Sequence, residues 1–343
     1  MIKILFAGHG DYPIYEQALY DAALKLRDID AFLFTERPYF QKINCSLIRR
    51  FENKMAIGYA VSELNHDLVL ECINKKIDII LIYSSRHIRP ETICTIKRMG
   101  VFIAQYCNDN PFSDFYPSYF WRHWKNSIKF CDVVYVYRNS NIKECKRFGS
   151  KVVKILRSYY IEESNYYIPD KQIDIDVPEV LFLGHREHDE REIYIRELAN
   201  TGVRVGLPNI PEWKDYEIGN ENIIRIDNAR TNYNLLLNKT KIALVFLSKI
   251  NKDTYTRRCF EIPATKTMMF SIYTDDLASM FEDKKDIVMF RNKEEFINGV
   301  HYYLTHDKIR EKIAVSGYER LIRDGHSAKD RVKEIIKDYY RYI

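Results

Sequence analysis

The first candidate for chemistry is a turn near the amino terminus that reads Gly8-His9-Gly10-Asp11. Glycines let the backbone approach a ligand closely, and a helix beginning after the turn would favour an anion. His9 can titrate or form hydrogen bonds near neutral pH. A tight strand-to-helix turn without a ligand explains the glycines equally well. The spacing is not that of the Gly-x-Gly-x-x-Gly fingerprint, so a nicotinamide enzyme is not supported.

A second polar group is the run Asn108-Asp109-Asn110, which follows the apolar segment 101–106. Carboxylate and amide groups in such a place can hold sugar hydroxyls or act as a base. Asparagine and aspartate also favour turns, because they hydrogen-bond their own backbone. Asp109 is therefore a candidate catalytic residue, with a structural turn as the alternative.

The later half of the chain places cations beside a glycine in the run Gly184-His185-Arg186. An arginine offers a planar, charged donor that suits phosphate, and the glycine allows a close backbone approach. Arg191 follows within the same charged stretch, and pairing with the neighbouring acidic residues is the alternative for it. We expect phosphate-binding groups in this turn.

Two acids, Asp253 and Glu261, enclose seven residues that include Arg257 and Arg258. A carboxylate can accept both hydroxyls of a ribose, while a nearby arginine stabilises the negative charge that develops on a diphosphate leaving group. Adjacent helical residues point in different directions, and we favour Arg258 for this task because it lies one turn from Glu261. Helix capping is the alternative for Glu261.

These candidates follow short apolar runs that alternate with amphipathic, helix-like stretches. Such alternation is typical of a doubly wound parallel sheet, and ligands of these sheets bind beyond the carboxyl ends of the strands. The first half contains runs at 2–7, 31–34, 77–83, 101–106, 133–137 and 152–156; the second contains runs at 180–183, 203–206, 223–226, 242–246, 268–272 and 287–290.

A polar stretch at 164–178 interrupts this alternation, so we predict an α/β protein with two Rossmann-like domains. Their predicted bounds are 1–165 and 179–325, followed by a helix over 326–343. A chain of 343 residues with 46% hydrophobic and 29% charged residues suits two such cores. Asp174-Ile175-Asp176 has the form of an Asp-x-Asp metal motif, but solvated linker charge explains it better.

Composition excludes several classes of function. The net charge of +5 arises from 53 basic and 48 acidic residues, a mild bias that does not suit a nucleic-acid binder. Apolar runs are too short for a membrane helix, and the amino terminus does not read as a signal peptide. The 7 cysteines form no Cys-x-x-Cys pair, which argues against a zinc site or disulfide framework and for a cytoplasmic protein.

The segment 112–124 is dense in aromatic residues and is followed by Lys125 and Lys129. Core packing explains it best. Stacking on sugar rings and contact with a membrane surface are the alternatives.

Several of these stretches together resemble CgeB-like (spore-maturation type) glycosyltransferases. The resemblance is carried in the later half by TRRCFEIPATKT at 256–267, by YTDDL at 273–277 and by the stretch from Gly184 to Leu198. In the first half it is carried by NHDLVL at 65–70 and NDNP at 108–111.

The resemblance implies a GT-B fold: a nucleotide-sugar domain at 179–325, an acceptor-side domain at 1–165 and a last helix that returns to the first domain. It implies neither a metal nor a cofactor. By analogy with retaining GT-B enzymes, Glu261 would bind ribose and Asp253 would lie near the donor sugar. The family carries a glutamate where this chain has Asp253, and an Asp-Asp-Pro where it has Asp109-Asn110-Pro111. These departures put the role of Asp253, and an acid role at Asn110, in doubt.

We therefore expect a cytoplasmic glycosyltransferase that moves a sugar from a nucleoside-diphosphate donor to a hydroxyl of a glycan, lipid or protein. Arg258, Arg186, His185 and the turns at Gly184 and at Gly8 and Gly10 would hold the donor. Asp109 or His9 would organise the acceptor. Two alternatives stay open: a nucleotide-sugar epimerase or hydrolase of the same fold, and a sugar-nucleotide-binding protein without activity. Peripheral contact with the inner face of a membrane is a further expectation.

Overall fold

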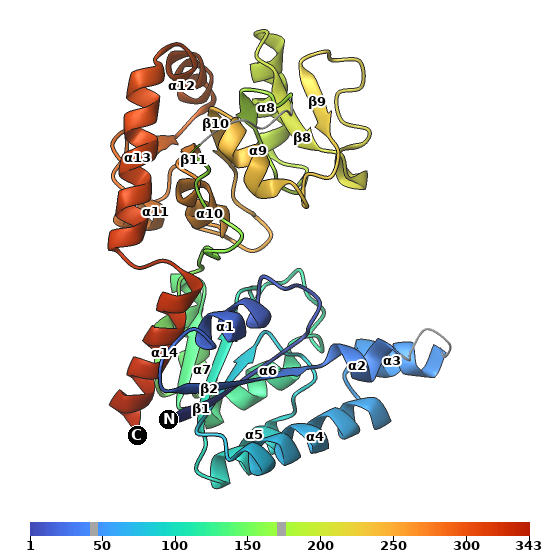
Figure 1. The fold of residues 1–343 in the computed structure, drawn as a ribbon. Helices are drawn as coiled ribbons and strands as arrows, with labels where there is room; N and C mark the ends of the chain where they lie inside the picture. Colours follow the sequence, from blue (N-terminus) through green and yellow to red (C-terminus); the bar gives the residue numbers. More distant parts are fainter. Residues whose placement is uncertain (42–46, 170–175) are drawn as a thin grey trace. The chain divides into compact units, whose positions relative to one another are not determined.

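A computed structural model describes residues 1–41, 47–169 and 176–343, which form two compact units (Figure 1). Unit 1 comprises Met1–Ser158 and Ala328–Ile343, and unit 2 comprises Tyr159–Ser327. The last segment of the chain therefore belongs to the first unit. The first unit ends earlier than the predicted bound at residue 165, so the chain leaves unit 1 before the polar stretch begins.

Unit 1 is built on a six-stranded parallel sheet in the order β2-β1-β3-β4-β5-β6. Strands β3, β4 and β5 are buried along their whole length, as expected for apolar runs covered on both faces. Each of the six predicted runs is a strand: β1 (Ile2–Gly8), β2 (Ile29–Thr35), β3 (Ile79–Tyr83), β4 (Phe102–Cys107), β5 (Val133–Val136) and β6 (Val153–Ile155).

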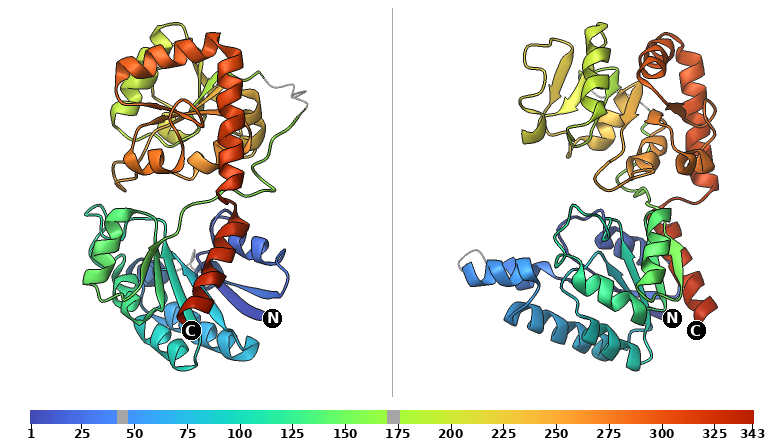
Figure 2. Two further views of the ribbon diagram at one scale, coloured as in Figure 1. Left: turned by 90° about the vertical axis from the view of Figure 1, so that its left-hand side faces the viewer. Right: turned by 180° about the vertical axis from the view of Figure 1, so that it is seen from behind.

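Helices cover both faces of this sheet. The last helix lies beside this sheet (Figure 2). It is tied to the sheet by Asp338, which accepts hydrogen bonds from Tyr135 Oη at 2.7 Å and Lys154 Nζ at 2.6 Å. The helices are α1 (Glu16–Ala23), α2 (Arg37–Gln41), α3 (Leu47–Met55), α4 (Tyr59–Lys75), α5 (Pro90–Arg98), α6 (Arg122–Ser127), α7 (Asn139–Arg147) and α14 (Ala328–Tyr342).

Unit 2 repeats the plan with a six-stranded parallel sheet in the order β12-β11-β10-β7-β8-β9. Its core joins the inner faces of these strands to α8 and α12, with Phe270, Phe290 and Phe296 in mutual ring contact. The strands are β7 (Val180–Leu181), β8 (Val205–Pro208), β9 (Ile223–Ile226), β10 (Ile242–Val245), β11 (Met268–Ile272) and β12 (Val288–Phe290). The helices are α8 (Glu190–Asn200), α9 (Tyr233–Lys239), α10 (Arg258–Ala264), α11 (Asp275–Met280), α12 (Lys293–Thr305) and α13 (Asp307–Arg323).

Each sheet reverses its strand order at one point, between β1 and β3 in unit 1 and between β7 and β10 in unit 2. Crevices at the carboxyl ends of the strands next to such a point are where open α/β sheets bind ligands. The segments after β1, β3, β7 and β10 are therefore the places to search for a site.

Candidate functional site

In unit 2, Arg258 lies beside the turn that follows β7. A Cβ atom added at Gly184 would come within 2.5 Å of Arg258 Nη2, so glycine is what allows the guanidinium to approach the backbone there. The Nε atom of Arg258 is buried, and it has no hydrogen-bond partner among the residues that the structure describes. A buried donor of a cation without an acceptor is costly unless a ligand supplies one. The arrangement suits an anion bound beside Gly184.

Glu261, one turn further along α10, is held by two donors. Arg257 Nε donates to its Oε1 at 2.6 Å, and Tyr233 Oη donates to its Oε2 at 3.0 Å. Burial raises the pKa of Tyr233 well above its usual range, so this hydroxyl keeps its proton. The helical spacing thus pairs Arg257 with Glu261 and leaves Arg258 directed at the glycine turn. A carboxylate has about four acceptor sites, so Glu261 retains capacity for a ligand hydroxyl.

A cavity of 390 Å³ opens at the carboxyl ends of β10 and β11, beside the start of α8. Asp253 lines it, and its backbone N–H donates to the carbonyl of Ser248 at 2.9 Å, which closes the loop after β10. Two lysines on the same loop, Lys249 and Lys252, also line it. The cavity therefore combines carboxylates, from Asp253 and from Asp189 and Glu190 at the start of α8, with cations next to the point where the strand order reverses.

The other candidates of the 184–191 turn are engaged by neighbours. Arg186 Nε donates to Glu192 at 2.7 Å, and its guanidinium lies 5.2 Å from the ring centroid of Tyr216. Arg191 is buried and donates to Asp189 at 2.8 Å and to the carbonyl of Leu247 at 2.9 Å, the neighbour pairing that the sequence left as an alternative.

His185 in the same turn is largely exposed and lies 3.4 Å from Glu212. A phosphate at His185 or Arg186 would compete with a carboxylate, whereas one at Arg258 would not. The role of these two residues in donor binding stays a prediction.

We expect Gly184→Ala to weaken binding of UDP about tenfold. The new methyl group would lie 2.5 Å from both Arg258 Nη2 and the ring of Phe182, so the guanidinium and the buried ring must both shift. Complete loss of one charged hydrogen bond would cost about 1.5–3 kcal/mol of binding free energy. The shifted arginine should keep part of this contribution, so the expected effect lies at the lower end. Isothermal calorimetry with UDP checks this. Gly202→Ala is the control: a Cβ there meets no atom within 4 Å, so the substitution should cost stability through its φ of +91° but leave the affinity for UDP unchanged.

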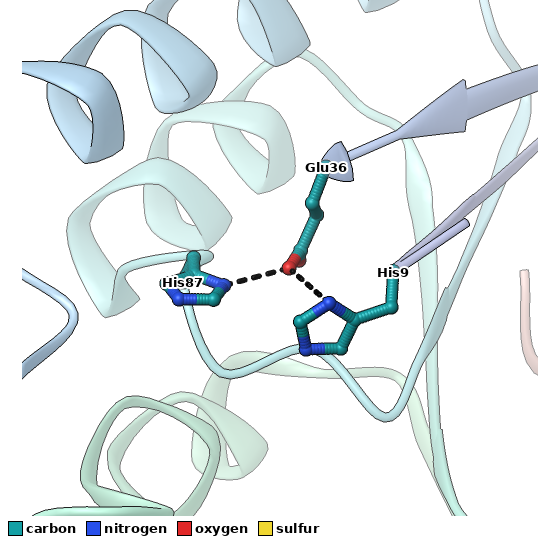
Figure 3. A group of neighbouring side chains, drawn as sticks. All are labelled: His9, Glu36 and His87. Carbon is teal, nitrogen blue, oxygen red and sulfur yellow. Dashed lines mark hydrogen bonds and ion pairs between the residues drawn. The ribbon is translucent and has the colours of Figure 1, made fainter. Parts of the chain in front are cut away.

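In unit 1, three neighbouring strands each deliver one residue to a cluster at their carboxyl ends (Figure 3). His9 follows β1, Glu36 follows β2 and His87 follows β3. Glu36 is fully buried; its Oε2 lies 2.7 Å from His87 Nδ1 and 3.5 Å from His9 Nδ1. Its other oxygen accepts a hydrogen bond from Ser85 Oγ.

The protons of this cluster follow from its geometry. His87 Nε2 faces two oxygens of Asn53, the side-chain Oδ1 at 2.9 Å and the backbone carbonyl at 3.2 Å, so this nitrogen carries a proton. Burial alone would raise the pKa of Glu36, but His9, His87 and Ser85 outweigh it and lower that pKa to about 2. Each ring nitrogen of His87 thus faces an acceptor oxygen, Glu36 Oε2 at Nδ1 and Asn53 at Nε2.

The three residues are also of the types that bind metals, with ligand atoms within 4.8 Å of one another. Zinc ligands at about 2.0–2.2 Å from a tetrahedral ion lie more than 3 Å apart, whereas His87 Nδ1 and Glu36 Oε2 are separated by 2.7 Å. The geometry is that of a hydrogen-bonded ion pair.

Asp109 follows β4 and lies close enough to His9 for the two side chains to interact electrostatically. Burial raises the pKa of this carboxyl, while Arg138 and His9 act in the opposite direction. A carboxyl group balanced in this way can exchange a proton nearer to neutral pH than an exposed aspartate. The structure thus brings two predicted catalytic residues, Asp109 and His9, into one region of unit 1.

The turn at Gly8 and Gly10 is filled by a carboxyl group of the chain itself. The backbone N–H of Gly10 donates to Glu16 Oε1 at 2.5 Å, and a Cβ at Gly8 would come 2.5 Å from Glu16 Cδ. Burial raises the pKa of Glu16. The glycines are therefore explained by contact with Glu16, and their predicted role in donor binding stays a prediction.

Three further sequence candidates have structural explanations or lie outside the described residues. Asn110 is buried, and its Oδ1 accepts from the N–H of Phe112 at 3.2 Å and from Asn141 Nδ2 at 2.9 Å, so this side chain holds the turn after β4 in place. In the aromatic segment, Trp121 and Trp124 are buried in the core of unit 1. Asp174 and Ile175 of the Asp-x-Asp motif lie outside the described residues.

Sequence reasoning missed Glu36 and His87. Both follow predicted strands, at 31–34 and 77–83, so the rule that ligands bind after strand ends was sufficient to point to them. Neither stands beside a glycine, which was the feature that singled out the turns after the first strand of each half. Tyr233 carried no signal, since only the packing of α9 against α10 brings it to Glu261.

Residues 187–337 match the model of a family described as glycosyl transferase-like. A search of curated proteins found no match. Among solved structures, HepE from Anabaena in complex with UDP and glucose has a TM-score of 0.69 at 12% identity, covering 99% of this chain and 100% of HepE. Sucrose-phosphate synthase from Thermosynechococcus elongatus has a TM-score of 0.71 at 11% identity, covering 99% of each chain.

A putative UDP-N-acetylglucosamine 2-epimerase from Listeria monocytogenes has a TM-score of 0.57 at 11% identity, covering 100% of this chain and 98% of that one. At such identities the likeness concerns the fold, and the predicted GT-B architecture of two Rossmann-like domains is confirmed. The family match agrees with the expected glycosyl transfer. The family match does not identify the CgeB-like subtype, which stays a prediction.

Proposed function

We propose that the protein is a glycosyltransferase that binds a UDP-sugar through unit 2 and transfers the sugar to a hydroxyl of a glycan, lipid or protein. The observation that carries this proposal is the guanidinium of Arg258, which is directed at Gly184 and whose buried Nε has no acceptor among the residues that the structure describes. It lies within the segment that matches the glycosyl transferase-like family. UDP is the nucleotide we propose because HepE, a structural neighbour, binds it.

In this proposal the donor is held without a metal ion. Arg258 stabilises the negative charge that grows on the diphosphate as the glycosidic bond breaks, a task for which fixed cations in a dry site are effective. Glu261 accepts the ribose hydroxyls, and Asp253 faces the sugar from the wall of the cavity. The spacing of Asp253 and Glu261, with seven residues between the two acids as in retaining GT-B enzymes, extends the proposal to retention of configuration at the anomeric carbon.

On the acceptor side, we assign Asp109 and His9 to binding and orienting the hydroxyl that receives the sugar. Both follow strands of unit 1, and the raised pKa of Asp109 allows this carboxyl to donate or accept a hydrogen bond. The proposal places the protein in the cytoplasm, in contact with the inner face of the membrane, in the synthesis of a surface polysaccharide or glycoconjugate.

The test begins with UDP alone. Calorimetry is expected to detect UDP binding by the wild type and a loss of about 10-fold or more in Glu261→Ala, because two ribose hydroxyls lose a charged acceptor. Glu319→Ala, at an exposed position on α13 of the same unit, is expected to bind as the wild type does. Absence of UDP binding by the wild type would reject UDP as the nucleotide, and unchanged affinity in Glu261→Ala would remove Glu261 from the site.

An epimerase or hydrolase is the second candidate, favoured by the likeness to the Listeria epimerase. Incubation with the UDP-sugar alone separates the two reactions. A transferase should leave most of the donor intact until an acceptor is added, whereas an epimerase or hydrolase converts it at once. UDP binding with no conversion under any of these conditions would point to a sugar-nucleotide-binding protein without activity.

A further inference from the structure

Helix α3 of unit 1 exposes its apolar residues to solvent. Leu47, Ile48 and Phe51 are 83%, 71% and 57% exposed. A helix on the surface of a globular protein normally turns its apolar stripe toward the core. In α3 this stripe faces the other way, so it requires a separate explanation.

The polar side of α3 is what attaches it to unit 1. Asn53 lies on the helix face opposite Leu47 and Phe51 and accepts a hydrogen bond from the buried His87. At the end of the helix, Arg122 Nη2 donates to the carbonyl of Met55 at 2.5 Å. With Asn53 directed inward, the apolar stripe must point outward. Figures 1 and 2 show α2 and α3 extending away from the sheet of unit 1.

Further apolar surface and positive charge adjoin the stripe. Tyr59, at the start of α4, is 66% exposed. The cations Arg50 and Lys54 are exposed on the same helix. The acidic residue of the helix, Glu52, is turned to the backbone, where it accepts from the N–H of Tyr59 at 3.3 Å. The exposed face thus combines aliphatic and aromatic side chains with cations.

We propose that α3 docks unit 1 on the surface of an anionic lipid bilayer. Leucine, isoleucine and phenylalanine would enter the boundary between head groups and acyl chains, and Arg50 and Lys54 would meet the lipid phosphates, as in other interfacial amphipathic helices. No helix in the described parts of the chain is long and apolar enough to cross a bilayer, so the contact is at the surface. The charge favours lipid over a second copy of the same helix, which would bring like charges together.

This inference deepens the proposed function by naming the surface that unit 1 would bind. It rests on the proposed function only for the reason why the protein would need a membrane contact. Its own observations are the exposure and orientation of α3, which do not involve the donor site. The docking and the donor binding are therefore tested by separate measurements.

Co-sedimentation with vesicles of phosphatidylglycerol and phosphatidylcholine tests the proposal, with pure phosphatidylcholine for comparison. We expect wild-type protein to bind the anionic vesicles and the variant Leu47→Ser/Ile48→Ser/Phe51→Ser to bind at least about 30-fold more weakly, because each buried apolar side chain contributes about tenfold. The variant Arg50→Glu/Lys54→Glu is expected to lose the preference for anionic lipid. The matched control is Ile193→Ser/Ile218→Ser/Ile322→Ser, which alters three exposed isoleucines of unit 2.

Hydrogen exchange in peptides from β1 and β3 reports whether unit 1 of each α3 variant is folded, and UDP calorimetry on the same preparations reports on the donor site of unit 2. The proposal is overturned if the wild type does not bind anionic vesicles, or if the α3 variant binds them as well as the control does. It is also overturned if sedimentation shows a wild-type dimer that the α3 variant dissociates, which would make this face an interface between two copies. Failure of UDP binding alone rejects the proposed donor and leaves the vesicle result standing.

Discussion

Arg258→Ala is expected to weaken UDP binding about 10- to 150-fold. The guanidinium is the cation at the Gly184 turn whose buried Nε has no acceptor in the described chain, and a hydrogen bond from a charged group to phosphate contributes about 1.5–3 kcal/mol. Turnover of UDP-glucose, where it is detected, should fall further, by about 10²–10³, because the charge on the leaving diphosphate is greatest in the transition state. Calorimetry with UDP and release of UDP from UDP-glucose measure the two effects.

Two variants sharpen this test. Arg258→Lys keeps the charge but loses the planar pair of donors, so its affinity is expected to lie between those of wild type and Arg258→Ala. Arg204→Ala removes a half-exposed arginine next to the amino end of β8, at the edge of the sheet opposite Gly184, and should leave UDP binding unchanged. Equal affinities for wild type and Arg258→Ala would show that the diphosphate is held elsewhere, with Arg186 the next candidate.

Glu36→Ala is expected to destabilise unit 1 by about 3–5 kcal/mol. Both partners of the Glu36–His87 pair are fully buried, and removal of one leaves the other charge without compensation in a region closed to water. The hydrogen bond from Ser85 is lost as well. Unfolding in urea, followed by hydrogen exchange in peptides from β1 and β3, measures the effect, and peptides from β10 and β11 report on unit 2 in the same sample.

The matched control is Glu63→Gln, an exposed position on α4, which should change the free energy of unfolding by less than about 0.5 kcal/mol. If Glu36→Ala lowers the free energy of unfolding by less than about 1 kcal/mol, the Glu36–His87 pair is accessible to water and our description of it as buried is wrong. A stabilising effect of Zn²⁺ on the wild type, absent from Glu36→Ala, would contradict our assignment of a hydrogen-bonded ion pair.

The carboxyl group of Glu36 also makes the free energy of unfolding of unit 1 fall at acidic pH. The pKa of Glu36 is about 2 in the folded protein against an ordinary value of 4.5, so the unfolded chain takes up this proton first as pH falls. The stabilisation is complete above about pH 4.5 and is lost as pH falls toward 2; the shift corresponds to about 3 kcal/mol. Urea midpoints between pH 6 and pH 2 should therefore fall less steeply in Glu36→Gln than in wild type.

The sequence by itself determined the two sheets. Each of the twelve apolar runs named from the sequence corresponds to a strand in the structure. The signal is clearest for the central strands, because a strand buried on both faces must be apolar along its length, and this requirement is local. The sequence also placed Gly184, Arg258 and Glu261 next to strand ends or helix starts.

Only the tertiary structure decided which of these residues meet. Helical spacing permits either arginine of the 257–258 pair to approach Glu261, and the packing of α9 and α10 beside the β7 turn assigns Arg257 to the carboxylate and Arg258 to the glycine. Likewise, Glu36 and His87 are 51 residues apart and become partners because their strands flank β1 in one parallel sheet. Strand order sets such contacts, and it depends on how whole helices cover the sheet, which no short stretch of sequence records.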